Sequence, residues 1–436
     1  MQFRSTKSKE TTVSFKDAVL NCLPLDGGLY VPDQAMDLRQ FFLYMDENIS
    51  YPELVATVAP SLLQGELNPF SAARVAESAF DFEPELIQLD EKHSILNLCK
   101  GPTGVFKDFG IAFFAAVLEE MIKNSRQAFV ISAVRGDTGV SMARAYFGRK
   151  GIYSVLVYPQ GSVFGLTPSC FATDGGNTIP IQVKGSFDDC QRLVMEIIKD
   201  REFAAEYAVT SGNAINAGRL LPQAFYYLYA FVKIKKYLTG DLIFSVPCGN
   251  FGNLIAGLYA WKFGMPVNGF IAAMNSNNAL GDFITGKPFI PRPPVTTNSP
   301  ALDIGFPSNL SRLESFYREA PAVMRNMVHP ASISDDLTLQ TMEQVWKKYN
   351  VFIDSHTAVA FAAAEQVAET GRKKGSAHTV ILATRHFAKD AELIQKTTRQ
   401  NLALPEPLRH LQKKTNPVAI IPPHLEALEG AIASCF

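Results

Sequence analysis

The strongest constraint on the fold is an alternation of short apolar runs with polar loops and helical segments, which begins near residue 86. The β-rich runs cover residues 128–134, 151–158, 242–247 and 379–384. The first, third and fourth are each followed by a loop and then by a helical pattern. This alternation predicts an α/β fold with mostly parallel sheets and with its functional loops at the carboxyl ends of the strands.

The segments on either side of this region have a different sequence pattern. Residues 11–80 have a helical pattern, with turns expected at 25–28, Pro52 and Pro60, and the last thirty or so residues indicate an irregular tail rich in proline. We therefore expect an N-terminal helical region (1–85), an α/β domain (86–215), a second α/β domain (216–400) and a C-terminal tail (401–436).

Composition excludes several classes of function. A formal net charge of −1 over 436 residues gives no basic field for nucleic acid or anionic membranes. No apolar run reaches membrane-spanning length, and the first residues contain no apolar segment of secretory type. The six cysteines form no C-x-x-C pair and the seven histidines no H-E-x-x-H pattern. We expect a cytoplasmic protein with reduced thiols and no metal, nucleic-acid or membrane partner.

Lys107 is the first candidate for chemistry. It follows Gly101-Pro102-Thr103-Gly104-Val105-Phe106 and precedes an apolar helical segment that extends to Ile122. Desolvation and the positive end of a helix dipole both favour a neutral lysine amine, the form that Schiff-base chemistry requires. The alternative is an ordinary lysine whose amine reaches solvent.

Two loops between a strand and a helix are candidate anion sites. Gly249-Asn250-Phe251-Gly252-Asn253 lets the backbone approach an anion, and helix dipole and N–H groups favour a phosphate there; a plain tight turn is the alternative. In Arg135-Gly136-Asp137-Thr138-Gly139, exposed amides suit a carboxylate and Asp137 suits a polar group of a cofactor. A helix N-cap is the simpler explanation of Asp137 or Thr138.

Further polar residues extend this set. Asn213, Asn216 and Arg219 lie near one helix start, where Arg219 could grip a carboxylate or phosphate and Asn213 could be only a cap. Thr384, at the end of the last strand, could meet a ring nitrogen or satisfy its own backbone. A lysine, two anion loops and a strand-end hydroxyl together suggest a pyridoxal-phosphate site.

The motifs resemble those of the threonine synthases, in fold type II of the pyridoxal-phosphate enzymes (tryptophan synthase β-like). The most specific segments are Asp26 to Pro32 and Phe187 to Gln191, and the lysine motif is Pro102 to Asp108. The remaining matches are Ser5-Thr6, residues 136–139, 213–216 with Arg219, 221–223, 249–253, 307–309 and 356–359.

The resemblance implies two α/β domains with parallel sheets, an N-terminal helical region and conversion of O-phospho-L-homoserine and water into L-threonine and phosphate. Lys107 would hold the cofactor and move protons, and the substrate would lie near Gly136, Thr138, Asn213, Asn216 and Arg219. The cofactor would contact Asp137 at its 3-oxygen, Gly249, Asn250, Phe251, Gly252 and Asn253 at its phosphate, and Thr384 at its ring nitrogen.

The chain departs from the family pattern around the expected substrate. Arg135 replaces a usual serine, residues 161–169 differ from the usual serine-proline-glutamine segment, and Ser355 and Phe387 replace prolines. Three alternatives follow: a phospho-lyase that gives a keto acid and ammonia, a silent cofactor-binding homologue, and, less favoured, a nucleotide-binding module. The sequence leaves the oligomeric state open.

Overall fold

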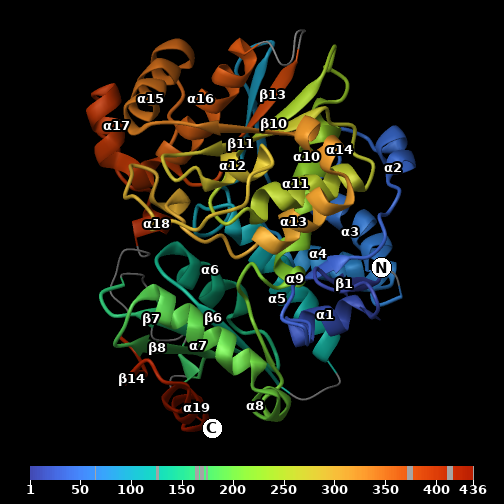
Figure 1. The fold of residues 1–436 in the computed structure, drawn as a ribbon, viewed down its shortest axis with the longest axis vertical. Helices are drawn as coiled ribbons and strands as arrows, with labels where there is room; N and C mark the ends of the chain where they lie inside the picture. The colour runs from blue at the N-terminus through green and yellow to red at the C-terminus, as the bar shows by residue number, and fades with distance from the viewer. Residues whose placement is uncertain are drawn as a thin grey trace.

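The computed structural model describes residues 1–63, 65–123, 127–162, 166, 171, 172, 175–370, 377–409 and 416–435. Two sheet regions, one above the other in Figure 1, are flanked by an N-terminal region. Each sheet region is a layer of strands covered by helices, so its inner strands are almost entirely buried, whereas the edge strands are partly exposed.

The larger sheet has six strands in the order β12-β11-β10-β13-β5-β4. All neighbours are parallel except β4 and β5. Its strands are β4 (Glu85–Gln88), β5 (His93–Asn97), β10 (Leu242–Pro247), β11 (Gly269–Met274), β12 (Val328–Ser332) and β13 (His378–Ala383). Helix α16 (Ser355–Glu369) packs on β10, β11 and β13, and α11 (Gly252–Lys262) also contacts β10 and β11.

The second sheet has five parallel strands in the order β14-β8-β7-β6-β9. They are β6 (Ala128–Ala133), β7 (Ile152–Pro159), β8 (Thr178–Val183), β9 (Val209–Thr210) and β14 (Ala419–Ile421). Helix α7 (Phe187–Lys199) covers β6 and β7, and its Ser186 capping box fixes where it begins.

The N-terminal region contains more than helices. Strands β1 (Phe3–Ser5), β2 (Thr12–Val13) and β3 (Tyr30–Pro32) form a small antiparallel sheet beside helices α1 (Phe15–Asn21), α2 (Arg39–Tyr44), α3 (Tyr51–Leu62) and α4 (Pro69–Ala79). The turns expected at Pro52 and Pro60 are wrong, because both prolines lie within α3. Pro52 is in the first turn, where no N–H is needed, and the buried face of α3 outweighs the bond that Pro60 removes.

The irregular tail expected for 401–436 is also wrong. Within its described residues, α18 (Glu406–Arg409) is followed by β14 and by α19 (Leu425–Ala433). β14 extends the five-stranded sheet, and α19 packs on α7 and buries Leu428 and Ile432. Three consecutive apolar residues suffice for a strand where an existing sheet edge supplies the hydrogen bonds.

Both sheets draw on strands from either side of the expected boundary at 215/216. β4 and β5 precede the boundary but belong to the six-stranded sheet, and β14 follows it but joins the five-stranded sheet. The division of the chain into domains stays a prediction, whereas the mostly parallel α/β architecture is observed.

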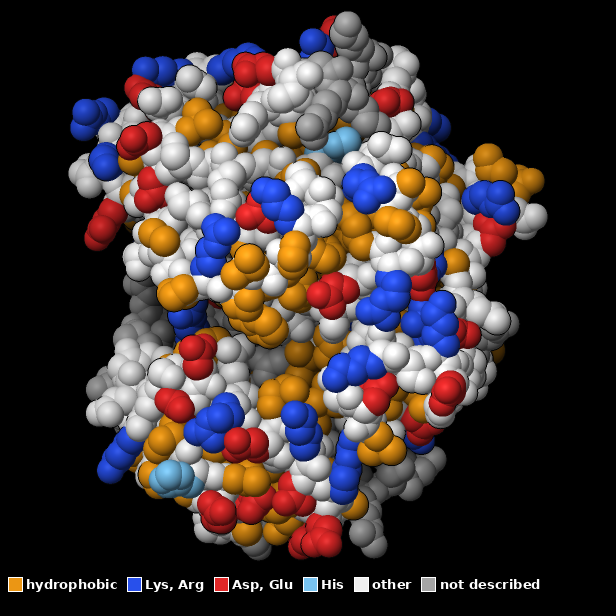
Figure 2. All heavy atoms as spheres, viewed as in Figure 1, with side chains coloured by type: hydrophobic (Ala, Val, Ile, Leu, Met, Phe, Trp, Pro, Cys, Tyr) orange, Lys and Arg blue, Asp and Glu red, His pale blue; other side chains and the backbone are white. Residues whose placement is uncertain are grey.

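The remaining helices complete the fold. They are α5 (Lys107–Ile122), α6 (Asp137–Tyr146), α8 (Arg201–Glu206), α9 (Ala217–Leu220), η3 (Leu221–Gln223), α10 (Ala224–Ile234), α12 (Ala279–Ile284), η4 (Pro300–Leu302), α13 (Leu310–Glu319), α14 (Pro321–Met327), α15 (Asp335–Tyr349), η5 (Phe387–Asp390) and α17 (Ala391–Thr398). Figure 2 shows a hollow between the two sheet regions, with hydrophobic side chains gathered at its edge. Among the described residues, no helix combines the length and the apolar character needed to cross a membrane.

Candidate active site

Lys107 is the first residue of α5, and a buried carboxylate fixes the turn that precedes it. Asp108 accepts hydrogen bonds from the N–H of Thr103 (2.8 Å), from the Thr103 hydroxyl (2.7 Å) and from the Ser141 hydroxyl. Gly101 packs against the same carboxylate so closely that a Cβ there would lie 2.5 Å from Asp108 Oδ2. The turn and α6 are therefore held together immediately beside Lys107.

The amine of Lys107 lies in an environment that disfavours its charge. Burial, followed by the positive charge of Arg219, lowers the pKa of Lys107 to about 8. Lys389 and Arg135 act in the same direction, and only Asp137 opposes them. The Lys107 Nζ donates to the Thr138 hydroxyl at 3.1 Å. The amine is thus partly neutral near physiological pH, as the sequence predicts.

The loop after β6 places the first turn of α6 beside Lys107, because the Thr138 hydroxyl lies in that turn. Gly136 is the N-cap residue with φ 53°, a conformation that favours glycine, so neither Asp137 nor Thr138 is the N-cap. Asp137 instead forms ion pairs with Lys389 (2.6 Å) and Arg385 (3.7 Å). Burial alone would raise the pKa of Asp137, but these cations hold it below its usual value.

The three polar residues after β9 differ in what they bind. Asn213 receives the N–H of Ala133 (2.9 Å) and donates to its carbonyl (2.8 Å), which fixes the end of β6. Asn216 is fully buried, caps α9 and donates to Val19 and Thr210, so these bonds give no support to the predicted substrate contact. Arg219 donates to the Gly212 carbonyl (2.7 Å), but its buried Nε has no partner.

Thr384 lies beside the lysine through backbone pairing. Its carbonyl accepts the N–H of Phe106 at 3.0 Å, and the N–H of His386 donates to the Gly104 carbonyl at 2.8 Å. The end of β13 is thereby joined to the residue that directly precedes Lys107. Thr384 itself is only 6% exposed.

The loop of residues 249–253 connects β10 to α11. Phe251 adopts φ 60° at the N-cap, a left-handed conformation uncommon for a non-glycine residue and typical of constrained functional turns. Asn250 accepts from the N–H of Ser308 (3.1 Å), and Asn253 accepts from the hydroxyls of Tyr226 (2.7 Å) and Tyr227 (2.8 Å). Among the described residues, the N-cap residue Phe251 gives α11 no side-chain capping bond, and a helix start of this kind is suited to bind an anion.

Comparison with known proteins gives a consistent result along the whole chain. Residues 2–80 match the model described as threonine synthase N terminus, residues 96–384 that of pyridoxal-phosphate dependent enzymes, and residues 357–432 that of the threonine synthase C-terminal part. The threonine synthase of Serratia marcescens is 32% identical over 411 residues, which are 94% of this chain and 93% of that protein.

The chain belongs to the threonine synthase family. The crystal structure of the Escherichia coli threonine synthase superimposes with a TM-score of 0.86 at 29% identity, covering 100% of both chains. The threonine synthase of Brucella melitensis with bound pyridoxal phosphate gives 0.87 at 26% identity, covering 100% of this chain and 99% of that chain. The family, the fold type II architecture and the cofactor expected from the sequence are confirmed.

The residues of this threonine synthase family member fit pyridoxal phosphate. Besides the low-pKa lysine, the side-chain amides of Asn253 and Asn309 each have a buried Nδ2 without a hydrogen-bond partner. The Asn309 Nδ2 would lie 3.6 Å from a Cβ at Gly252, so it faces the start of α11. Buried donors without partners are costly unless an acceptor satisfies them, and an anionic phosphate supplies such acceptors.

Several residues that lie around the site were not assigned a role from the sequence. Asn309 lies in a matched segment but was given no role, and Lys389 was not singled out, because only the fold brings them next to Gly252 and Asp137. The altered segment 161–169 lies largely outside the described residues, as 163–165 and 167–169 are not described. Its effect on the substrate stays a prediction.

Proposed function

We propose that the chain is a threonine synthase that converts O-phospho-L-homoserine and water into L-threonine and phosphate. The single observation that carries this proposal is the Lys107 amine, with a pKa of about 8, beside three cations and one carboxylate. A site with excess positive charge suits a substrate that carries a phosphate and a carboxylate. Family membership along the whole chain supports the same reaction.

We assign the cofactor contacts to the loops described above. Gly249 to Asn253 would hold the cofactor phosphate at the start of α11, Asp137 would face its 3-oxygen, and Thr384 its ring nitrogen. Bound pyridoxal phosphate supplies an electron sink that stabilises a carbanion on the substrate. A hydroxyl opposite the ring nitrogen, in place of a carboxylate, leaves that nitrogen largely unprotonated.

We assign to Lys107 the movement of protons at Cα and Cβ of the substrate. In the overall reaction the bond between Cγ and the phosphate oxygen breaks, Cβ loses a proton and gains the hydroxyl of water, and Cγ becomes a methyl group. An amine with a pKa of about 8 suits both steps, because it accepts and returns protons near neutral pH. Gly136, Thr138, Asn213 and Arg219 would orient the substrate.

The visible absorption of the purified protein tests the lysine assignment. We expect a band from cofactor bound through Lys107 in the wild type and in Lys123→Ala, which changes an exposed lysine after the end of α5. The band should be lost in Lys107→Ala. An unchanged band in Lys107→Ala would contradict the assignment.

The reaction itself is tested by supplying O-phospho-L-homoserine and measuring threonine, 2-oxobutyrate and phosphate. Threonine in equal amount to phosphate supports the proposal. A preponderance of 2-oxobutyrate would indicate the phospho-lyase, and no phosphate release would indicate a silent homologue. We also propose a cytoplasmic location, because the five described cysteines are free thiols.

A further inference from the structure

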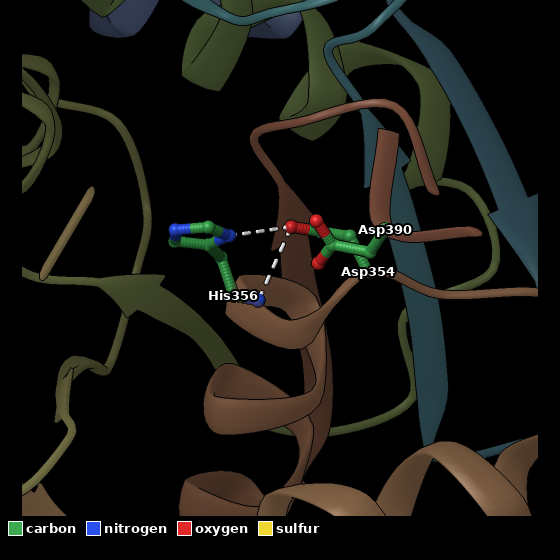
Figure 3. A group of neighbouring side chains, drawn as sticks. All are labelled: Asp354, His356 and Asp390. Carbon is green, nitrogen blue, oxygen red and sulfur yellow. Dashed lines mark hydrogen bonds and ion pairs between the residues drawn. The ribbon is translucent and has the colours of Figure 1, made fainter. Parts of the chain in front are cut away.

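A buried histidine outside the assigned contacts joins two distant segments. His356, in the first turn of α16, is 2% exposed. Figure 3 shows its ring and its backbone N–H both directed at the Asp354 carboxylate, with Nδ1 at 2.8 Å from Oδ2 and the backbone nitrogen at 3.1 Å. On the other side of the ring, Nε2 accepts the N–H of Ala301 at 3.1 Å. Because Nε2 accepts, the ring proton is on Nδ1 and is donated to Asp354.

Ala301 belongs to η4, which lies directly on the first residue of the phosphate loop. A Cβ at Gly249 would be 2.7 Å from the Ala301 carbonyl oxygen and 3.2 Å from the Leu302 Cα. Both are backbone atoms that a side chain could not displace at low cost. The position of η4 therefore limits where Gly249 can lie, and Gly249 begins the loop that ends at Asn253.

The carboxylates around His356 are themselves fixed. Asp354 accepts hydrogen bonds from the N–H and hydroxyl of Thr357. Burial alone would raise the pKa of Asp354, but its bonds from His356 and Thr357 hold it below its usual value. Asp390 accepts from the Ser355 hydroxyl (2.7 Å) and pairs with Arg385.

Asp354, His356 and Asp390 are close enough together to hold a cation. Their protein contacts already engage both ring nitrogens and both carboxylates, so the cluster is explained without an ion.

We propose that His356 is a positioning residue that holds η4 against Gly249 and so fixes the shape of the cofactor-phosphate loop. This inference rests on the proposed role of residues 249–253. Asp354 sets the tautomer and direction of the imidazole, and the imidazole accepts the Ala301 N–H. The coupling runs through one side-chain hydrogen bond and one backbone contact.

Three variants separate this role from general stability. His356→Asn keeps an amide within reach of Asp354 but is too short to reach Ala301. His356→Gln is longer and can place its amide oxygen near the former Nε2. Thr341→Val removes a buried hydroxyl bond to the Leu337 carbonyl within α15, a helix that packs on α16, and serves as the matched control because that bond involves neither Asp354 nor η4.

Two readouts are measured on each variant: hydrogen exchange of the peptide containing Ala301, and the dissociation constant of pyridoxal phosphate by equilibrium dialysis. We expect His356→Asn to exchange Ala301 faster and to bind the cofactor about three- to tenfold more weakly, the effect of losing about one hydrogen bond. His356→Gln should recover part of both losses, and Thr341→Val should show neither.

Unchanged exchange and unchanged cofactor affinity in His356→Asn would overturn the inference, as would equal losses in Thr341→Val. A wild-type protein that binds no cofactor would instead refute the proposed function. The exchange measurement needs no cofactor, so it still decides whether His356 holds η4.

Discussion

Replacing Lys389 by methionine should raise the pKa of Lys107. The Lys389 side chain is 5% exposed and its Nζ lies 2.6 Å from Asp137 Oδ1. Methionine keeps much of the apolar stem and removes the charge. Lys107 then loses a repelling cation, and Asp137, which already favours its charged form, loses its closest partner. Both changes favour protonated Lys107, so their effects add.

The expected magnitude follows from the charges involved. For two unit charges within one site, a separation of about 8 Å serves as an order-of-magnitude value and gives about 2 kcal/mol at an effective dielectric constant of about 20, or about 1.5 pH units. Solvent on the open side of Lys107 and the ion pair left between Arg385 and Asp137 reduce this value. We therefore expect the pKa of Lys107 to rise by about one pH unit.

The assay is competitive labelling of the cofactor-free protein with acetic anhydride, quantified at Lys107 by mass spectrometry from about pH 6 to about pH 10. Only the neutral amine reacts, so the wild-type rate should reach half its maximum near pH 8. Lys347→Met removes an exposed lysine from an ion pair elsewhere and should leave the profile unchanged. Lys389→Arg should stay close to the wild type. An unchanged or lower midpoint in Lys389→Met would refute the electrostatic account of Lys107.

Three further predictions concern the surroundings of the site. Gly249→Ala should weaken cofactor binding in equilibrium dialysis and lower the free energy of unfolding in urea by about 1–3 kcal/mol, because the new Cβ would meet the Ala301 carbonyl oxygen. In the same measurements Gly430→Ala should be neutral or stabilising, because this glycine lies in α19 with open space around it. Asp108→Asn should lower the free energy of unfolding in urea by about 1–3 kcal/mol, because three donors lose a charged acceptor; an unaltered unfolding midpoint would contradict this. Arg135→Ser should raise KM for O-phospho-L-homoserine about two- to fivefold with little change in kcat, because an exposed cation contributes modestly to anion binding, and steady-state kinetics would detect it.

The sequence pattern was sufficient to predict a feature where the residues of the segment themselves determine it. The runs 128–134, 242–247 and 379–384 are mostly apolar and rich in β-branched residues, and the structure has β6, β10 and β13 there. Burial at the start of an apolar helix likewise gives the largest contribution to the lowered pKa of Lys107, whereas the charges that act beside it, led by Arg219, come from segments that only the fold brings together. What was predictable, the strands and the burial of this lysine, depends on residues that are neighbours in the sequence.

The sequence pattern did not reveal features that depend on a partner far away in the chain. β14 is a strand because β8 lies beside it, although its own sequence is surrounded by prolines. The bonds of Asn216 are another case, because Val19 and Thr210, one of them almost two hundred residues away, engage its amide, while its contact with the substrate stays a prediction. A polar side chain near a helix start therefore predicts a hydrogen bond but does not identify the partner.

The same reasoning explains why the support of the phosphate loop was not predicted. The loop is readable as a glycine-containing turn after β10, but its position depends on η4 and Ser308, about fifty residues further along the chain. His356, a further fifty-five residues from Ala301, then fixes η4 from the start of α16. Each contact is weak as a sequence signal because it uses a backbone group, which every residue has. A glycine-containing turn between a strand and a helix can thus be predicted from its own residues, whereas the contacts that hold it in place come from segments whose sequence gives no sign of them.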